Sequence, residues 1–216
     1  MKQESLKFEF EARYFQEGEL TIKTKNLFFV LHGHGQQSKY FIKKFNPLFS
    51  ASSCVIAPEG LSRYYLEGFS GRVGATWMTR EERLTDIQNY LSYLNTLYKG
   101  LEQNIGEQTK IHILGFSQGA ATASRWAANQ AMRFDSLILW SGIFPPDMDF
   151  KFAATKFAGK PITYVYGVED PFLNEERLNA MKVLSNKLKV VPKIIKFMGG
   201  HEIEPETLNT LSLSLQ

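Results

Sequence analysis

The sequence predicts an α/β protein in which a mostly parallel central sheet carries an N-terminal antiparallel hairpin and helices on both faces. Residues 6–15 alternate apolar and charged side chains, which is the period of a half-buried strand. Later segments are short and continuously apolar, which is typical of parallel strands buried on both faces. These segments alternate with amphipathic ones of helical spacing, and such helices are the crossovers that parallel strands need.

The expected elements follow one another along the chain. Residues 6–15 form the first strand, and residues 16–19 turn it into an antiparallel partner at 20–24. The remaining strands are expected at 26–35, 54–58, 110–114, 136–140, 161–167 and 191–197. The helices are expected at 37–49, at 79–100, directly after Ser117, from Asn174 and from Pro205.

The helix at 79–100 has the clearest pattern. Thr79 and Glu82 have the spacing of a capping box at its start, and Gly100 can end it. Its apolar stripe consists of Leu84, Ile87, Leu91, Leu94 and either Leu97 or Tyr98.

The segment 59–77 is the one long stretch that has no regular pattern. Loops of this length in a compact domain are usually functional, often as lids. Its aromatic residues and internal glycines therefore predict a mobile wall over the active site.

Length and composition limit the classes of protein that remain. A chain of 216 residues without repeats or linkers predicts a single domain over 1–216. Its 25 basic residues exceed 22 acidic ones by only three and are scattered, so no nucleic-acid partner is expected. No segment approaches the ~18 apolar residues of a membrane span and no leader is apparent, so a cytoplasmic location is expected. The lone Cys54 excludes an intramolecular disulfide and is expected to be a buried hydrophobe.

Ser117 is the candidate nucleophile. It stands between Gly115 and Gly119 in the pattern G-x-S-x-G, after an apolar strand and before a helix of small residues. In a nucleophile elbow of this kind the serine is held on a strained strand-to-helix turn, and its hydroxyl is exposed at the carboxyl edge of the sheet. The alternative is an ordinary turn with a solvent-facing serine.

His201 is the candidate base, because in this architecture the chain order is serine, acid, histidine. It is the only one of the four histidines that follows Ser117. The acid should come from a loop after a strand between these two residues.

Asp170 is the preferred acid. Pro171 fixes the direction of the chain after Asp170, and the short side chain of Asp170 suits a buried hydrogen bond to an imidazole. Glu169 remains an alternative, as do Asp147 and Asp149, which also follow a strand.

An oxyanion hole needs two backbone donors. The residue after the nucleophile supplies one, Gln118 N–H, and the loop after the third strand supplies the other, His34 N–H, between two glycines. A rival interpretation makes His32 and His34 a metal pair, but no third ligand has suitable spacing, so no metal is expected. Four residues are candidates for an apolar wall on the acyl side, although each of them could instead belong to the core: Phe69, Trp77, Met78 and Phe144.

With these features in place, the chain resembles the α/β-hydrolases of the phospholipase/carboxylesterase family, relatives of acyl-protein thioesterases. The matching stretches are "FVLHGHGQ", "IHILGFSQGAA", "LWSGIFP", "YGVEDPF" and "GGHEI". The resemblance implies an α/β-hydrolase fold, a triad of Ser117, Asp170 and His201, and an oxyanion hole at His34 and Gln118.

The chain departs from the family pattern at three places. Gln36 and Gln37 stand where an acidic residue is usual, and Ala120 replaces a common second glycine. In addition, the substrate-channel sequence of the thioesterases is not recognisable in 59–77.

The sequence therefore predicts a serine hydrolase that cleaves small-molecule carboxylic esters, with thioesters as a further class, and that needs no cofactor. One alternative is a non-catalytic binding protein of the same fold, against which the intact Ser–Asp–His set argues. The other is a different hydrolase, such as a peptidase or a lactone hydrolase. The sequence leaves acyl chain length, leaving group and oligomeric state open.

Overall fold

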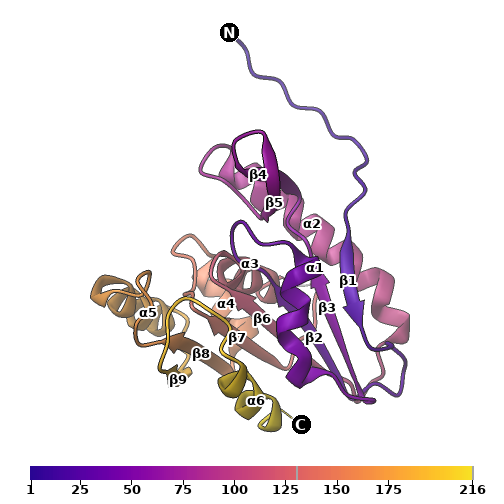
Figure 1. Cartoon of the computed structure of the whole chain (residues 1–216), viewed down its shortest axis with the longest axis vertical. Helices are drawn as coiled ribbons and strands as arrows, with labels where there is room; N and C mark the ends of the chain where they lie inside the picture. Colours follow the sequence, from indigo (N-terminus) through magenta and orange to yellow (C-terminus); the bar gives the residue numbers. More distant parts are fainter. Residues whose placement is uncertain (130, 216) are drawn as a thin grey trace.

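The computed structural model describes residues 1–129 and 131–215. Its main sheet has seven strands in the order β1-β3-β2-β6-β7-β8-β9, and all of them are parallel except β1 (Figure 1). The strands of this sheet are β1 (Tyr14–Glu17), β2 (Asn26–Leu31), β3 (Ser53–Pro58), β6 (Lys110–Phe116), β7 (Ser136–Trp140), β8 (Ile162–Gly167) and β9 (Lys193–Phe197).

Helices cover both faces of the sheet, as predicted. They are α1 (Ser38–Phe41), the 3-10 helix η1 (Ile42–Leu48), α2 (Arg83–Leu101), the 3-10 helix η2 (Glu102–Asn104), α3 (Gln118–Ala127), α4 (Phe150–Phe157), α5 (Glu175–Lys187) and α6 (Pro205–Leu213). One apolar layer packs α2, α3, α4 and α5 against the sheet, and a second layer packs α1, η1 and α6 against the opposite face. The strands predicted from continuous apolar runs are thus buried between two layers, which confirms the α/β class. Helix α4 was not predicted from the sequence, and its first turn is capped by the Asp149 carboxylate.

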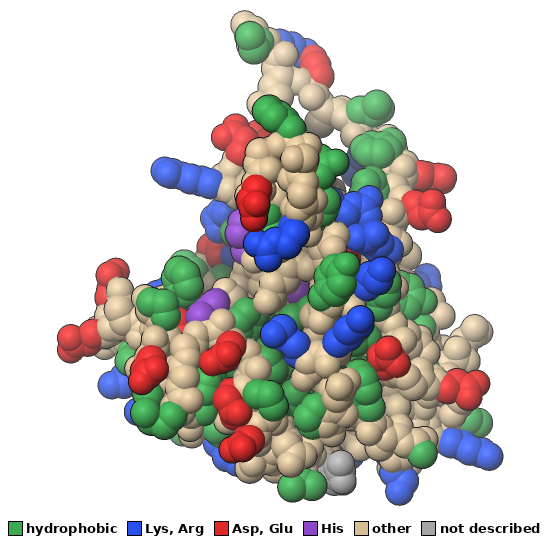
Figure 2. All heavy atoms as spheres, viewed as in Figure 1, with side chains coloured by type: hydrophobic (Ala, Val, Ile, Leu, Met, Phe, Trp, Pro, Cys, Tyr) green, Lys and Arg blue, Asp and Glu red, His purple; other side chains and the backbone are tan. Residues whose placement is uncertain are grey.

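The predicted N-terminal hairpin is wrong. Residues 6–13 belong to no strand, and Leu6, Phe8 and Phe10 are exposed on an arm that leads away from the body (Figures 1 and 2). Residues 20–24 do not pair with β1 either, because Thr21 and Thr24 close a turn through the Thr24 hydroxyl and amide. Strand β1 pairs antiparallel with β3 at the edge of the sheet instead.

The boundaries of α2 also differ from the prediction. The helix begins at Arg83, because Glu82 adopts a left-handed conformation with φ 49°, and the Thr79 hydroxyl donates to Glu81 O rather than capping the helix. Gly100 lies inside the helix, which continues to Leu101.

The segment 59–77 is not irregular. It forms a separate antiparallel hairpin of β4 (Ser62–Glu67) and β5 (Ser70–Thr76). Gly68 and Gly71 have φ of 61° and 84°, so the glycines that interrupt the pattern are positions of the turn and of the strand beside it. The hairpin is joined to the loop after β2 by a bridge between Gln36 and Ala75. None of the helices in the described part of the chain is long and apolar enough to cross a membrane.

Candidate active site

Ser117 lies in the sharp turn between β6 and α3. Its φ and ψ are 54° and −116°, a backbone conformation that residues other than glycine rarely adopt. Both flanking glycines are required by close packing, because a Cβ at Gly115 would lie 2.2 Å from Gly119 O, and a Cβ at Gly119 would lie 2.2 Å from Leu31 O. The turn therefore has the geometry that the G-x-S-x-G pattern predicts.

The structure brings His201 and Asp170 together. His201 Nδ1 lies 2.8 Å from Asp170 Oδ2, and the carboxylate side chain is completely buried. The other carboxylate oxygen accepts a hydrogen bond from the Phe172 amide at 2.9 Å. Both oxygens of Asp170 are thus occupied, so the carboxylate has a fixed orientation toward the imidazole.

The alternative acids serve elsewhere. Glu169 is exposed to solvent. Asp147 forms ion pairs with Arg83 and Arg125, at 2.6 and 2.5 Å. Asp149 caps α4, so neither of these two carboxylates is free to orient an imidazole.

The loops that carry Asp170 and His201 are held against each other at the carboxyl edge of the sheet. Glu169 N donates to Gly199 O at 3.0 Å, and Gly167 approaches Gly199 so closely that a Cβ there would lie 2.1 Å from its carbonyl oxygen. Behind them, Trp140 Nε1 donates to Glu202 O at 2.7 Å. The parallel strands β6, β8 and β9 therefore bring Ser117, Asp170 and His201 to the same edge of the sheet.

The imidazole of His201 contacts two phenyl rings. Its ring centroid lies 4.9 Å from that of Phe116, which precedes the serine, and 4.7 Å from that of Phe172. The Ser117 hydroxyl makes no hydrogen bond to another residue that the structure describes, His201 included. Hydrogen bonds of catalytic groups often tighten only when substrate binds, so this geometry is compatible with the catalytic role that the sequence predicts for Ser117.

The predicted oxyanion donors flank Ser117. Gln118 is the first residue of α3, and the N–H groups of a first helical turn have no acceptor within the helix. The positive end of the helix dipole also stabilises negative charge near this N–H group. The loop of His34 lies against Ser117, because a Cβ at Gly33 would be 3.2 Å from Ser117 Cβ. His34 itself is exposed, and histidine side chains are visible at the surface in the space-filling view (Figure 2).

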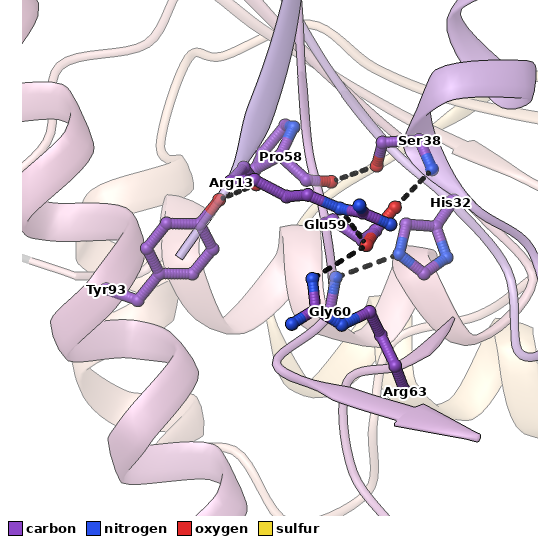
Figure 3. Close-up of polar contacts among 8 residues, drawn as sticks. All are labelled: Arg13, His32, Ser38, Pro58, Glu59, Gly60, Arg63 and Tyr93. Carbon is purple, nitrogen blue, oxygen red and sulfur yellow. Dashed lines mark hydrogen bonds and ion pairs between the residues drawn. The ribbon is translucent and has the colours of Figure 1, made fainter. Parts of the chain in front are cut away.

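His32 supports this loop from inside the protein (Figure 3). Its Nδ1 lies 2.7 Å from Gly33 O and its Nε2 accepts the Gly60 amide at 2.9 Å, so the proton resides on Nδ1. Burial lowers the pKa of this imidazole to about 4. Both ring nitrogens are occupied by the backbone, so His32 cannot serve as a metal ligand beside His34. The described residues contain no cluster of three or more metal-ligating side chains.

Glu59 is a buried carboxylate that was not predicted from the sequence. It lies directly after β3, where Arg13 Nε donates to it at 2.6 Å and Ser38 N donates at 3.1 Å (Figure 3). Tyr93 in turn donates to Arg13 O at 2.9 Å. This cluster joins the residue before β1 to α1, α2 and the end of β3. A glutamate directly after an apolar strand was the only signal in the sequence.

The four candidates for an apolar wall do not lie together. Phe69 is 99% exposed at the turn of the hairpin, and the Phe144 ring packs in the core against Phe157 and Tyr164. Trp77 is buried, stacks on His32 and donates its Nε1 to His32 O at 2.8 Å. Only Met78 is half-buried near Gln118. The four residues therefore do not form one continuous surface, because two of them are buried in the core and the hairpin turn exposes a third.

Comparisons with known proteins agree with this geometry. The model of the phospholipase/carboxylesterase family matches residues 19–216. Among solved structures, the chain is similar to acyl-protein thioesterase 2 of Zea mays, with 18% identity, a TM-score of 0.71 and coverage of 95% of this chain and 98% of that one. It is similar to esterase PE8 with 19% identity, a TM-score of 0.71 and coverage of 95% and 98%. It is also similar to a Bacillus cereus carboxylesterase, with 13% identity, a TM-score of 0.68 and coverage of 94% and 93%. At these identities the likeness shows the fold. No curated protein was found to match the chain.

Proposed function

Because the chain belongs to the phospholipase/carboxylesterase family, we propose that it is a serine hydrolase that cleaves carboxylic esters and thioesters through an acyl-enzyme on Ser117. One observation carries the proposal. A serine in a strained strand-to-helix turn shares a sheet edge with a histidine that is hydrogen-bonded at 2.8 Å to a buried aspartate. An isolated surface serine would have no reason for the strain, and a binding module would have no use for all three groups.

The first half of the reaction forms the acyl-enzyme. Ser117 Oγ attacks the acyl carbonyl carbon while His201 Nε2 takes the hydroxyl proton. Asp170 keeps the proton of the neutral ring on Nδ1 and stabilises the imidazolium that forms. The oxyanion accepts hydrogen bonds from the His34 and Gln118 amides. The intermediate then collapses, and the alcohol or thiol leaves with the proton from His201.

The second half repeats these steps with water. His201 takes a proton from the water as its oxygen attacks the acyl carbon, and the same two amides hold the oxyanion. Collapse releases the carboxylic acid and returns the proton to Ser117. All the groups come from the chain, so the reaction needs no cofactor.

The similar structures support an acyl carbonyl as the substrate group. One of them is named a thioesterase and two are named esterases. All three names denote hydrolysis of an acyl group that is bonded to oxygen or sulfur. We therefore propose small-molecule acyl esters as the substrate class.

The test combines labelling with turnover. A fluorophosphonate probe should label Ser117, and p-nitrophenyl esters of rising chain length should be hydrolysed. Ser117→Ala should abolish labelling and lower kcat by ~10⁴ or more, because a triad nucleophile is lost. Ser92→Ala, at an exposed position of α2, is the matched control and should leave both unchanged.

Two outcomes contradict the proposal. A protein that is neither labelled nor active would be a binding module of this fold. A labelled protein that hydrolyses peptides or lactones but no simple ester would be a different hydrolase with the same nucleophile.

A further inference from the structure

Thr76 connects the two residues whose amides are the proposed oxyanion donors. It is the last residue of β5 and its side chain is almost completely buried. Its hydroxyl oxygen lies 3.1 Å from His34 Nδ1 and 3.0 Å from Gln118 Oε1. The same oxygen lies 2.9 Å from Met78 O. One hydroxyl therefore connects the His34 loop with the first residue of α3, each of which is 42 positions from Thr76 in the sequence.

The neighbours of Gln118 fix the orientation of its amide. The Trp77 backbone N–H can only donate, and it points to Gln118 Oε1 at 3.1 Å. The Met78 carbonyl can only accept, and Gln118 Nε2 donates to it at 2.8 Å. The oxygen of the side-chain amide therefore faces the Thr76 hydroxyl.

The proton positions follow from this orientation. The Thr76 hydroxyl has one proton, and both Gln118 Oε1 and Met78 O are acceptors, so that proton is directed to them. His34 Nδ1 then carries a proton and donates it to Thr76 Oγ1. This leaves His34 Nε2 as an acceptor for the Tyr64 hydroxyl, at 2.7 Å. The hydrogen bonds run in one direction, from Tyr64 through His34 and Thr76 to Gln118.

The backbone of the hairpin holds the same loop. Gly35 N donates to Ala75 O at 2.9 Å, and Ala75 N donates to Gln36 O at 3.1 Å. Gly74 approaches this loop so closely that a Cβ would lie 2.6 Å from Gly35 O. The end of β5 is thus attached to the His34 loop on one side and to the first residue of α3 on the other.

We propose that Thr76 is a positioning residue of the oxyanion hole, whose hydroxyl sets the His34 amide at the correct distance and angle from the Gln118 amide. This inference rests on the proposed function. Two amides that converge on one point stabilise a developing oxyanion more than a neutral carbonyl. The hydroxyl therefore affects the transition state more than the binding of substrate.

The test compares Thr76→Val, which keeps the shape and removes the hydroxyl, with Thr76→Ser, which keeps the hydroxyl. Loss of a whole oxyanion donor lowers kcat by ~10²–10³, and a misplaced donor should cost less, so we expect Thr76→Val to lower kcat by roughly 10–100-fold. KM should stay within about twofold, and Thr76→Ser should retain kcat within about threefold. A trifluoromethyl ketone, which forms a hemiketal oxyanion on the serine, should bind Thr76→Val more weakly by the same factor as kcat falls. Thr96→Val, at an exposed position of α2, is the matched control and should leave all three quantities unchanged.

A second variant keeps the proposal falsifiable if Thr76→Val is poorly folded. His34→Ala retains the backbone amide and removes the exposed ring that binds Thr76. It should lower kcat as Thr76→Val does, and if both fold, the double variant should lose little more than either single variant.

Three results would overturn the proposal: a raised KM with unchanged kcat, a full loss in Thr76→Ser, or wild-type kcat in His34→Ala. A wild-type protein that is neither labelled by fluorophosphonate nor active would overturn the proposed function itself.

Discussion

The backbone strain at Ser117 predicts that Ser117→Gly is more stable than Ser117→Ala. The φ and ψ of 54° and −116° are accessible to glycine, whereas a residue with a Cβ pays about 1–3 kcal/mol there. Glycine also has more conformational freedom in the unfolded chain, and this lowers the free energy of unfolding by about 0.5–1 kcal/mol. The net difference between the two variants should be about 1 kcal/mol in favour of glycine. Alanine retains the Cβ, and therefore the strain, while both variants lack the hydroxyl.

Thermal unfolding measures this difference directly. For a chain of this size, 1 kcal/mol corresponds to about 2–4 °C, so Ser117→Gly should melt about that much above Ser117→Ala. A matched pair at Ser92, in the interior of α2, should show the opposite order, because glycine weakens a helix by about 1 kcal/mol relative to alanine. A Ser117→Gly variant that melts at or below Ser117→Ala would refute the argument that the turn is strained.

Two further predictions concern the acid and a buried histidine. Asp170→Asn should lower kcat for ester hydrolysis by ~10³–10⁴, because an amide cannot keep the His201 proton on Nδ1. Glu169→Gln, at an exposed position, should keep a kcat near that of the wild type. The reverse order of the two kcat values would assign the acid to Glu169. Burial lowers the pKa of His112 to about 4, below the ordinary value of 6.5, so the unfolded chain binds a proton first and the free energy of unfolding falls as the pH drops from 6.5 to 4. Denaturant titrations at pH 7 and pH 4.5 measure how much free energy of unfolding each protein loses between these pH values. His112→Asn should lose about 2–3 kcal/mol less than wild type, and an equal loss in both proteins would contradict this cause.

The fold could be predicted where burial leaves a pattern in the sequence. Strands between two helical layers are apolar throughout, and the elbow needs glycine on both sides of Ser117 because backbone atoms lie within 2.2 Å of where a Cβ would be. Alternation at residues 6–15 has the same appearance whether or not a neighbouring strand exists to pair with it, and here none of the described strands pairs with residues 6–13. The hairpin of β4 and β5 was missed for a related reason, since most of its side chains are exposed and show no apolar period.

The site could be predicted only in part. Chain order and the strand ends predicted that Ser117, Asp170 and His201 meet at one edge, and the structure brings their loops there. Polar contacts between distant segments leave no local pattern, so neither the Thr76 hydroxyl nor the Glu59 carboxylate was found. Nor could the sequence separate a pocket wall from the core at Trp77, since an aromatic residue before a helix serves either purpose.

The Glu59 cluster has a consequence for where the chain can be shortened. The family match begins at residue 19, and a truncation to that boundary would look harmless because residues 1–12 make few contacts. It would remove Arg13 and all of β1, and with them the closest cation to a carboxylate that is 2% exposed. The outer edge of β3 would also be opened to pairing with other chains. The natural limit for trimming therefore lies before Arg13, and a shorter protein is expected to aggregate rather than merely to lose an arm.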